Sequence, residues 1–279
     1  MIRRILIPLD ISPHTTAAIE YGCFVARQTS AEITGMAVLD IPHSKPSGSR
    51  SQLTGAFTPD QVDEDLREQV QGYIRSVCDN FKLECEQNGV NYSIDEEHAF
   101  VSDQIVSESI YHDLVVTGLR THYHFETEGD VGELLEELLD HSVTMTVAVP
   151  DYFVAPVVRM RVLICFDGSL QSARALQRFS RLAEMAEYDI TLLMATEVKR
   201  VADYHLTRAE AYLRAHGLGN ITVVWTEEDI KDALISNYLP GADMVVLGSH
   251  SKKGFFDFRL GSLSRYLIRQ ENKLLVLGV

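Results

Sequence analysis

Hydrophobic residues in this chain occur in short continuous runs, separated by longer segments in which they recur every three or four positions. Runs rich in Val, Ile and Leu cover residues 3–9, 33–39, 90–94, 113–117 and 144–149, and each predicts a buried strand. The segments between them predict helices that bury one face. Buried strands that alternate with helices are typical of a parallel sheet covered on both faces, so the sequence predicts an α/β fold.

The helices predicted for the first half lie between these strands. They cover residues 12–29, residues 59–89, the segment after Ser102, and residues 131–140. Ser12 is a suitable N-cap and Pro13 suits a first helical turn, which sets the start of the first helix. Residues 41–58 are rich in Ser, Gly and Pro and predict a loop.

The chain repeats its own pattern. Residues 5–12 (ILIPLDIS) return as residues 162–169 (VLICFDGS), and residues 113–118 (DLVVTG) return as residues 243–248 (DMVVLG). The offset is 157 residues in the first pair and 130 in the second, so the second copy is shorter by 27 residues. A period of this length predicts a duplicated domain rather than a solenoid.

We therefore expect one domain over residues 1–150 and a second over residues 157–279. The second should lack most of the loop and part of the long helix of the first. In open parallel sheets, ligands bind at the carboxyl ends of the strands. Asp10, Asp167 and the segment that begins at Gly248 all follow predicted strands, which makes them candidates for a site.

The segment from Gly248 to Ser262 connects a predicted strand to a predicted helix. The helix pattern follows at Leu263, Tyr266 and Leu267. Gly248 lets the backbone leave the strand sharply, and Gly261 lets it approach a ligand. Free N–H groups at the helix start, with Lys252 and Lys253 nearby, favour an anion such as phosphate. Alternatively, the glycines serve only the geometry of the turn.

The spacing from Gly248 through Ser251 to Gly261 and Ser262 resembles the phosphate loop of the universal stress protein family, glycine-x2-glycine-x9-glycine-serine. One position departs from the pattern, because Ser251 stands where the family has its second glycine. The resemblance extends to nearly the whole chain as a tandem pair of such domains. It implies two doubly wound domains of the adenine nucleotide alpha hydrolase-like kind, each with five parallel strands, which pair through their fifth strands.

The resemblance also implies that the second half binds ATP, ADP or AMP, with Mg²⁺ as a companion ion. The implied contacts are Asp167, Gly168, Ser169, Gly248, Ser249, His250, Ser251, Gly261, Ser262, Leu263 and Ser264. Asp167 would lie beside the nucleoside, where a carboxylate can accept hydrogen bonds. Alternatively, Asp167 only caps the helix that follows. Asp10 holds the same place in the first half, followed by Ile11 instead of a glycine.

The corresponding loop of the first half is a poor phosphate site. After Gly118, the next matching glycine, Gly132, comes one residue late. Its carboxylates, at Glu126, Glu128, Asp130 and Glu133, would repel a triphosphate, and Glu133 replaces the serine of the pattern. The segment is either an altered ligand site or an acidic solvated loop, and the density of charge favours the second interpretation.

Charge separates the two halves. Residues 1–150 carry 9 Lys and Arg against 25 Asp and Glu, a net charge of −16, whereas residues 151–279 carry 16 against 15, a net charge of +1. Neither half is strongly basic, so no nucleic-acid partner is expected. A phosphate ligand should prefer the second half. The apolar runs are too short for a membrane span or a secretory signal, so neither is expected.

The cysteines and histidines add little to the candidate chemistry. The cysteines (Cys23, Cys78, Cys85 and Cys165) lack CxxC spacing. We expect buried thiols in a reducing compartment, which favours the cytoplasm. His122 and His124 have acidic neighbours and could bind a metal ion, but the sequence assures no third ligand, so no metal site is expected.

No nucleophile elbow and no Walker lysine motif occurs, so we expect no catalytic residues and at most very slow ATP hydrolysis. The expected function is that of a cytoplasmic stress-response protein, regulated by a nucleotide bound in its second half. One alternative is a scaffold that binds no nucleotide and acts through a protein partner. Another is an enzyme on a nucleotide or sulfur substrate. The resemblance is compatible with a homodimer.

Overall fold

The computed structural model describes residues 1–10, 12–38, 64–100, 102–120, 135, 138–139, 141–156, 159–183, 187–248, 262–270 and 272–278. The first half contributes β1 (Arg4–Leu9), α1 (Pro13–Thr29), β2 (Glu32–Val38), α2 (Glu64–Asn88), β3 (Tyr92–Phe100), α3 (Ser102–Ser109), β4 (Leu114–Gly118) and β5 (Met145–Val149). The second half contributes β6 (Met160–Cys165), α5 (Leu170–Leu182), β7 (Tyr188–Ala195), α6 (Lys199–Ala215), β8 (Ile221–Thr226), α7 (Ile230–Ala233), η4 (Leu234–Tyr238), η5 (Leu239–Gly241), β9 (Met244–Gly248), α8 (Ser262–Gln270) and β10 (Leu274–Gly278).

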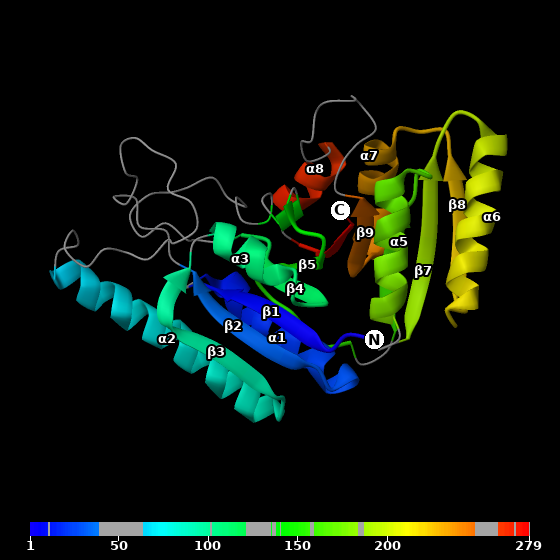
Figure 1. Cartoon of the computed structure of the whole chain (residues 1–279). Coiled ribbons are helices and arrows are strands. Elements are labelled where there is room, and N and C mark those ends of the chain that lie inside the picture. Colours follow the sequence, from blue (N-terminus) through cyan, green and yellow to red (C-terminus); the bar gives the residue numbers. More distant parts are fainter. Residues whose placement is uncertain are drawn as a thin grey trace.

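The described strands form one sheet in the order β3-β2-β1-β4-β5-β10-β9-β6-β7-β8, which spans both halves (Figure 1). All neighbouring pairs are parallel except β5 and β10, which are antiparallel, with Val147 opposite Val276. The sequence prediction that the fifth strands pair within the chain is therefore confirmed. The pairing covers two apolar edges that would otherwise be exposed.

The predicted elements of the first half are present, with shifted ends. α1 covers the predicted range almost to the residue. β3 extends to Phe100, well beyond the predicted end at residue 94, through the charged sequence Asp95-Glu96-Glu97. A charged stretch is compatible with a strand here because β3 is the edge of the sheet and pairs only with β2. Of the helix predicted near residues 131–140, residues 135, 138 and 139 are described, and all three are helical.

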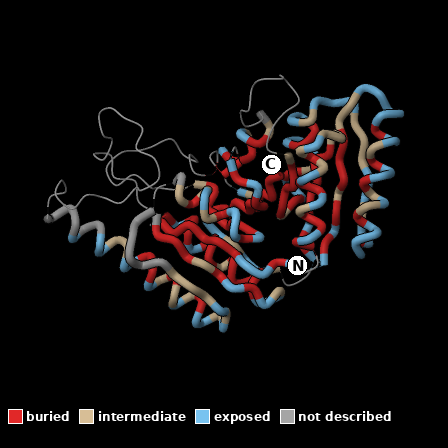
Figure 2. The backbone as a smooth tube through the Cα atoms, viewed as in Figure 1, coloured by how far each residue is buried: buried red, intermediate tan, exposed pale blue. Residues whose placement is uncertain are grey.

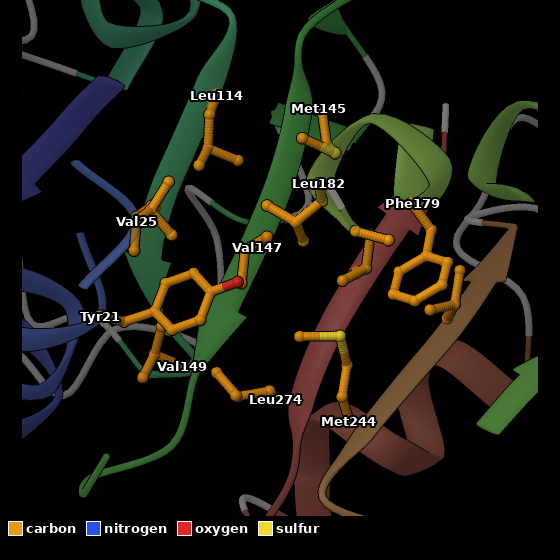
Figure 3. Close-up of a cluster of buried hydrophobic side chains, with 14 of the residues drawn as sticks. Tyr21, Val25, Leu114, Met145, Val147, Val149, Phe179, Leu182, Met244 and Leu274 are labelled. Carbon is orange, nitrogen blue, oxygen red and sulfur yellow. The ribbon is translucent and has the colours of Figure 1, made fainter. Parts of the chain in front are cut away.

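Helices cover both faces of the sheet, and buried residues follow the central strands, whereas β8 at one edge has none (Figure 2). One face carries α1, α2, α5 and α6 over a single apolar cluster that continues across both halves. Tyr21 and Val25 of α1 pack on one side of this cluster, and Phe179 and Leu182 of α5 on the other (Figure 3). The opposite face carries α3 in the first half and α7, η4, η5 and α8 in the second half.

Two contacts fix the junction between the halves. Phe153 of the linker packs edge-on against Tyr21, with ring centroids 5.1 Å apart. Arg178 of α5 donates from Nη2 to the Val143 carbonyl oxygen at 2.5 Å, just before β5. The linker and α5 therefore hold the first half directly, in addition to the β5–β10 pairing.

The cysteines are free and buried, as the sequence predicts; they are Cys23, Cys78, Cys85 and Cys165. Burial raises the pKa of the Cys165 thiol to about 12, so this side chain is inert as a nucleophile at neutral pH. In the part of the chain that the structure describes, every helix is too short or too polar to cross a bilayer.

Candidate functional site

The candidate site lies where the neighbouring strands β6 and β9 end and α5 and α8 begin. Gly248, the last residue of β9, packs closely against the start of α5. A Cβ added there would lie 2.8 Å from Gln171 Cβ and 2.9 Å from the Ser172 backbone nitrogen. A residue with a side chain would force these apart. On the other side, Ser264 Oγ donates to the Gly248 carbonyl oxygen at 3.2 Å. The starts of two helices therefore converge on the end of β9.

Asp167 holds the turn that leads from β6 into α5. Its Oδ1 accepts a hydrogen bond from the Ser169 backbone N–H at 2.9 Å. Gly168 has a φ of 73°, in the left-handed region that favours glycine. The N-cap of α5 is Ser169, whose Oγ accepts from the Ser172 N–H at 3.2 Å. The alternative that Asp167 caps this helix is therefore wrong, and all three residues of the turn are only half-buried.

The predicted contacts are brought together in part. Asp167, Gly168, Ser169, Gly248 and Ser264 lie at one end of the sheet, with Ser262 as the first residue of α8 and Leu263 half-buried behind it. Ser249, His250, Ser251 and Gly261 lie outside the described residues, as do Lys252 and Lys253. Ser264 is 1% exposed. Because its hydroxyl donates to the protein backbone, Ser264 is better suited to holding α8 than to contacting a ligand.

His205, which the sequence does not indicate as a site residue, lies over the same turn. A Cβ added at Gly168 would lie 2.6 to 2.9 Å from three atoms of the His205 ring. The ring also packs edge-on against Tyr204, at 5.1 Å between centroids, and against Phe166 at 6.4 Å. α6 therefore forms one wall of the site. No signal in the sequence pairs His205 with Gly168, since the two residues are far apart along the chain and share no motif.

The arrangement favours an anion beside a carboxylate. The first turns of α5 and α8 contain no acidic residue, and each helix start carries a partial positive charge. Asp167 can accept hydrogen bonds from hydroxyl or amine groups. Among the described residues, no group of three or more His, Cys, Asp or Glu side chains is placed to hold a metal ion. The candidate metal residues His122 and His124 lie outside them.

The same position in the first half is closed. Asp10 is 2% exposed, and its Oδ1 accepts from the Ser12 backbone N–H at 2.9 Å, from the Ser12 hydroxyl at 2.6 Å and from the Thr15 hydroxyl. Gly118, at the end of β4, packs against His14, whose Cβ lies 2.5 Å from an added Cβ. The Asp10 carboxylate is therefore buried among its own hydrogen-bond donors, whereas Asp167 is half-buried. The acidic loop that follows Gly118 lies outside the described residues.

Comparison with solved structures shows the fold over the full length. A universal stress protein from Archaeoglobus fulgidus covers 99% of this chain and 95% of its own, at 17% identity and a TM-score of 0.69. A Pseudomonas aeruginosa protein assigned to the same family covers 99% and 92%, at 11% identity and a TM-score of 0.60. A universal stress protein solved in complex with cAMP covers 44% of this chain and 98% of its own, at 21% identity and a TM-score of 0.37.

Curated protein sequences give no match. The sequence profile of the Universal stress protein family matches residues 1–150, more than half of the chain. The full-length structural matches include both halves, which share one ten-stranded sheet. The chain belongs to the universal stress protein family and has its tandem architecture.

Proposed function

We propose that this chain binds one adenine nucleotide at the carboxyl end of its second-half sheet and acts as a nucleotide-responsive regulator. The observation that carries the proposal is the convergence of α5 and α8 on Gly248, next to the half-buried Asp167. Helix starts suit the phosphates, and the carboxylate suits hydroxyl or amine groups of the nucleoside. Any accompanying Mg²⁺ would be held by the phosphates and by Asp167, because Mg²⁺ prefers oxygen ligands.

Charge supports the choice of half. The first 150 residues carry a net charge of −16 and the remainder +1. An unfavourable electrostatic difference of only ~1.4 kcal/mol lowers affinity tenfold. In the first half, moreover, the oxygen of Asp10 is already occupied by its own turn. Both effects favour a single nucleotide per chain. The free, buried cysteines suit a reducing compartment, which supports a cytoplasmic location.

We expect ATP turnover far below the ~1–100 s⁻¹ of dedicated phosphoryl-transfer enzymes. Asp167 is the one carboxylate of the described turn, and its Oδ1 holds the Ser169 N–H, so no separate base is evident for orienting a water molecule. Steady-state phosphate release with ATP and Mg²⁺ measures the rate. A rate inside the enzymatic range that disappears in Asp167→Ala would establish an enzyme.

The experiment that tests binding is mass spectrometry of the gently denatured, freshly purified protein, followed by nucleotide binding to the stripped protein. We expect an adenine nucleotide in the wild type and much less in Asp167→Ala. Asp167→Asn is the matched control, since it keeps an oxygen that can accept from the Ser169 N–H. Absence of nucleotide in both measurements would favour the alternative of a scaffold that acts through a protein partner.

A further inference from the structure

A cavity lies at the end of the second-half strands opposite to the candidate nucleotide site. It has a volume of about 580 Å³, in the range typical of small-molecule sites. Its walls are the amino-terminal parts of β6, β7 and β8, together with η4 and η5. The residues that matter for its chemistry are Thr191, Thr222, Asn237, Tyr238 and Ala242. None of these residues belongs to the nucleotide site proposed above.

The cavity exposes polar side chains on a sheet face that should be covered. Thr191 and Thr222 are directly opposite each other on the parallel strands β7 and β8, so both side chains lie on the same face. Parallel sheets normally bury both faces under helices and read as continuous apolar runs. Here Thr191 is half-buried and Thr222 is exposed. Two adjacent hydroxyl groups therefore face the cavity.

The first half shows what the same place looks like when it is filled. Thr34 pairs with Leu6 as Thr191 pairs with Leu163, and Thr34 lies opposite Ser93 on β3. The imidazole of His112 covers this pair. Its Nε2 lies 3.2 Å from Thr34 Oγ1, and its Nδ1 lies 3.0 Å from the Glu108 carbonyl oxygen.

The hydrogen bonds of the His112 ring indicate its tautomer. A carbonyl oxygen only accepts, so Nδ1 of His112 carries the proton and Nε2 accepts from the Thr34 hydroxyl. His112 is 6% exposed, and burial is the main cause that lowers its pKa. The ring is therefore neutral at pH 7. A buried, uncharged nitrogen heterocycle fills the first-half position.

The second half lacks this ring. Ala242 stands two residues before β9, as His112 stands two residues before β4. The next residues confirm the correspondence, because Asp243 N–H donates to the Arg161 carbonyl and Asp113 N–H donates to the Arg4 carbonyl, both at 2.9 Å. A methyl group thus replaces an imidazole.

The covering helix also differs in form. α3 has eight residues, whereas α7 has four and continues as the π-helical segment η4, which supplies Asn237 and Tyr238 to the cavity. π-Helical segments are frequent at functional sites. An aromatic ring and an amide therefore lie where the first half has an ordinary helix.

Charges around the cavity are already paired. Arg161 donates to both carboxylate oxygens of Asp243, at 2.6 Å and 3.0 Å. Asp189 accepts from Asn220 at 3.1 Å and from Arg159 at 3.5 Å. A charged ligand would compete with these pairs, whereas a neutral one would not.

From these observations we infer that this cavity binds a small, planar, uncharged nitrogen heterocycle, which accepts a hydrogen bond from the Thr191 hydroxyl as His112 accepts one from Thr34. Tyr238 lines the cavity and supplies an aromatic side chain against which such a ring can pack. The site is separate from the nucleotide site, so either can fail without the other.

The test uses imidazole as the probe, at pH 8, where it is mostly uncharged. Backbone amide shifts of Thr191, Thr222 and Ala242 are followed by NMR in the full chain. We expect saturable shifts at these residues with a Kd of roughly millimolar, as is usual for a ligand with so few atoms. Thr191→Val should weaken binding about tenfold, the effect of one lost hydrogen bond.

Two variants exchange the residues at the matching positions 112 and 242. Ala242→His should place a ring inside the cavity and abolish the shifts at Thr191 and Thr222. His112→Ala should open the first-half position, so that imidazole also shifts Thr34 and Ser93. If His112→Ala does not fold, the imidazole titrations of the wild type and of Ala242→His still test the inference. Absence of saturation in the wild type up to about 50 mM imidazole, or shifts that persist in Ala242→His, would overturn the inference.

Discussion

Asp10 and Asp167 occupy the same position at the end of the first strand of each half, yet only Asp167 is accessible. Asp10 is 2% exposed and holds two hydroxyl groups and a backbone N–H. Asp167 is half-buried and holds the backbone N–H that leads into α5. The halves differ in the same direction at the other end of the strands. There His112 covers the first half, whereas Ala242 leaves a cavity in the second half.

Both differences lead to the same interpretation. In the first half, polar side chains at both ends of the strands, such as Asp10 and His112, are buried and hydrogen-bonded to neighbouring side chains. In the second half, the side chains at the matching positions, such as Asp167 and Thr222, are half-buried or exposed. Under the function proposed above, the second copy carries the ligand site and the first copy acts as its structural partner. In this chain the partner role is direct, because β5 and β10 complete one sheet.

The largest expected effect concerns Asp10. Asp10→Ala should lower the free energy of unfolding by about 3 kcal/mol, because it leaves buried hydroxyl and N–H donors without their acceptor. Asp167→Ala should cost at most about 1 kcal/mol, since its turn is partly solvated. Urea unfolding measures both. Asp10→Asn, which keeps an acceptor oxygen, should lose less than Asp10→Ala. If Asp10→Ala and Asp167→Ala lowered the free energy of unfolding equally, the two carboxylates would not differ in structural role as described.

The next effect is the pH dependence of stability through His112. Burial lowers its pKa in the folded chain, so below a pH of about 6.5 the unfolded chain binds a proton that the folded chain does not. The free energy of unfolding should therefore fall as the pH drops from about 6.5 towards the folded-state pKa, by at most ~1.4 kcal/mol per pH unit.

Urea unfolding of the wild type and of His112→Gln between pH 8 and pH 5 isolates this contribution. The difference between the two at pH 8 gives the cost of the substitution itself. We expect the difference to shrink as the pH falls, because the variant has no group to titrate at this position. A difference that stays constant over this range would contradict the account.

The smallest expected effect on stability is that of the exposed ion pair between Arg161 and Asp243, next to the second-half cavity. The Arg161 guanidinium, by donating hydrogen bonds, holds the pKa of the Asp243 carboxyl below its usual range. The pair stabilises the folded chain above the unfolded-state pKa of about 3.9, and this contribution is lost as the pH falls through the lower folded-state value. The side chains are 58% and 39% exposed, so solvent screening keeps the contribution within about 1 kcal/mol.

An NMR titration of the Asp243 carboxyl carbon measures this pair. We expect the pKa to rise in Arg161→Ala and in high salt. Arg159→Ala is a matched control, since Arg159 pairs with Glu187 and Asp189 instead. A pKa that does not move in Arg161→Ala would assign the shift to another cause.

The sequence predicts the sheet well because its central strands are buried on both faces and appear as apolar runs. The pairing of β5 with β10 follows from the same runs, since both would otherwise be exposed edges. β3 is longer than predicted because an edge strand tolerates charged residues that hide it in a hydrophobicity pattern.

The candidate site is predictable only where its residues share a motif. Asp167, Gly168 and Ser169 follow a strand directly and are found at its end. His205 reaches Gly168 through the packing of α6, which no local pattern reveals. The burial of Asp10 depends on hydrogen bonds from Ser12 and Thr15, which the helix pattern of these residues does not reveal. Such differences arise from tertiary packing and appear only in the folded chain.

The central claim, that only the second half is open to a nucleotide, is tested most directly by isothermal titration calorimetry with ATP. Gly261→Glu adds a carboxylate to the second-half loop, and Gly132→Glu is the matched control because it adds the same group to the first-half loop. We expect one ATP per wild-type chain, loss of binding in Gly261→Glu, and unchanged binding in Gly132→Glu. Two equal sites per chain, or a single site that Gly261→Glu leaves intact, would contradict the account.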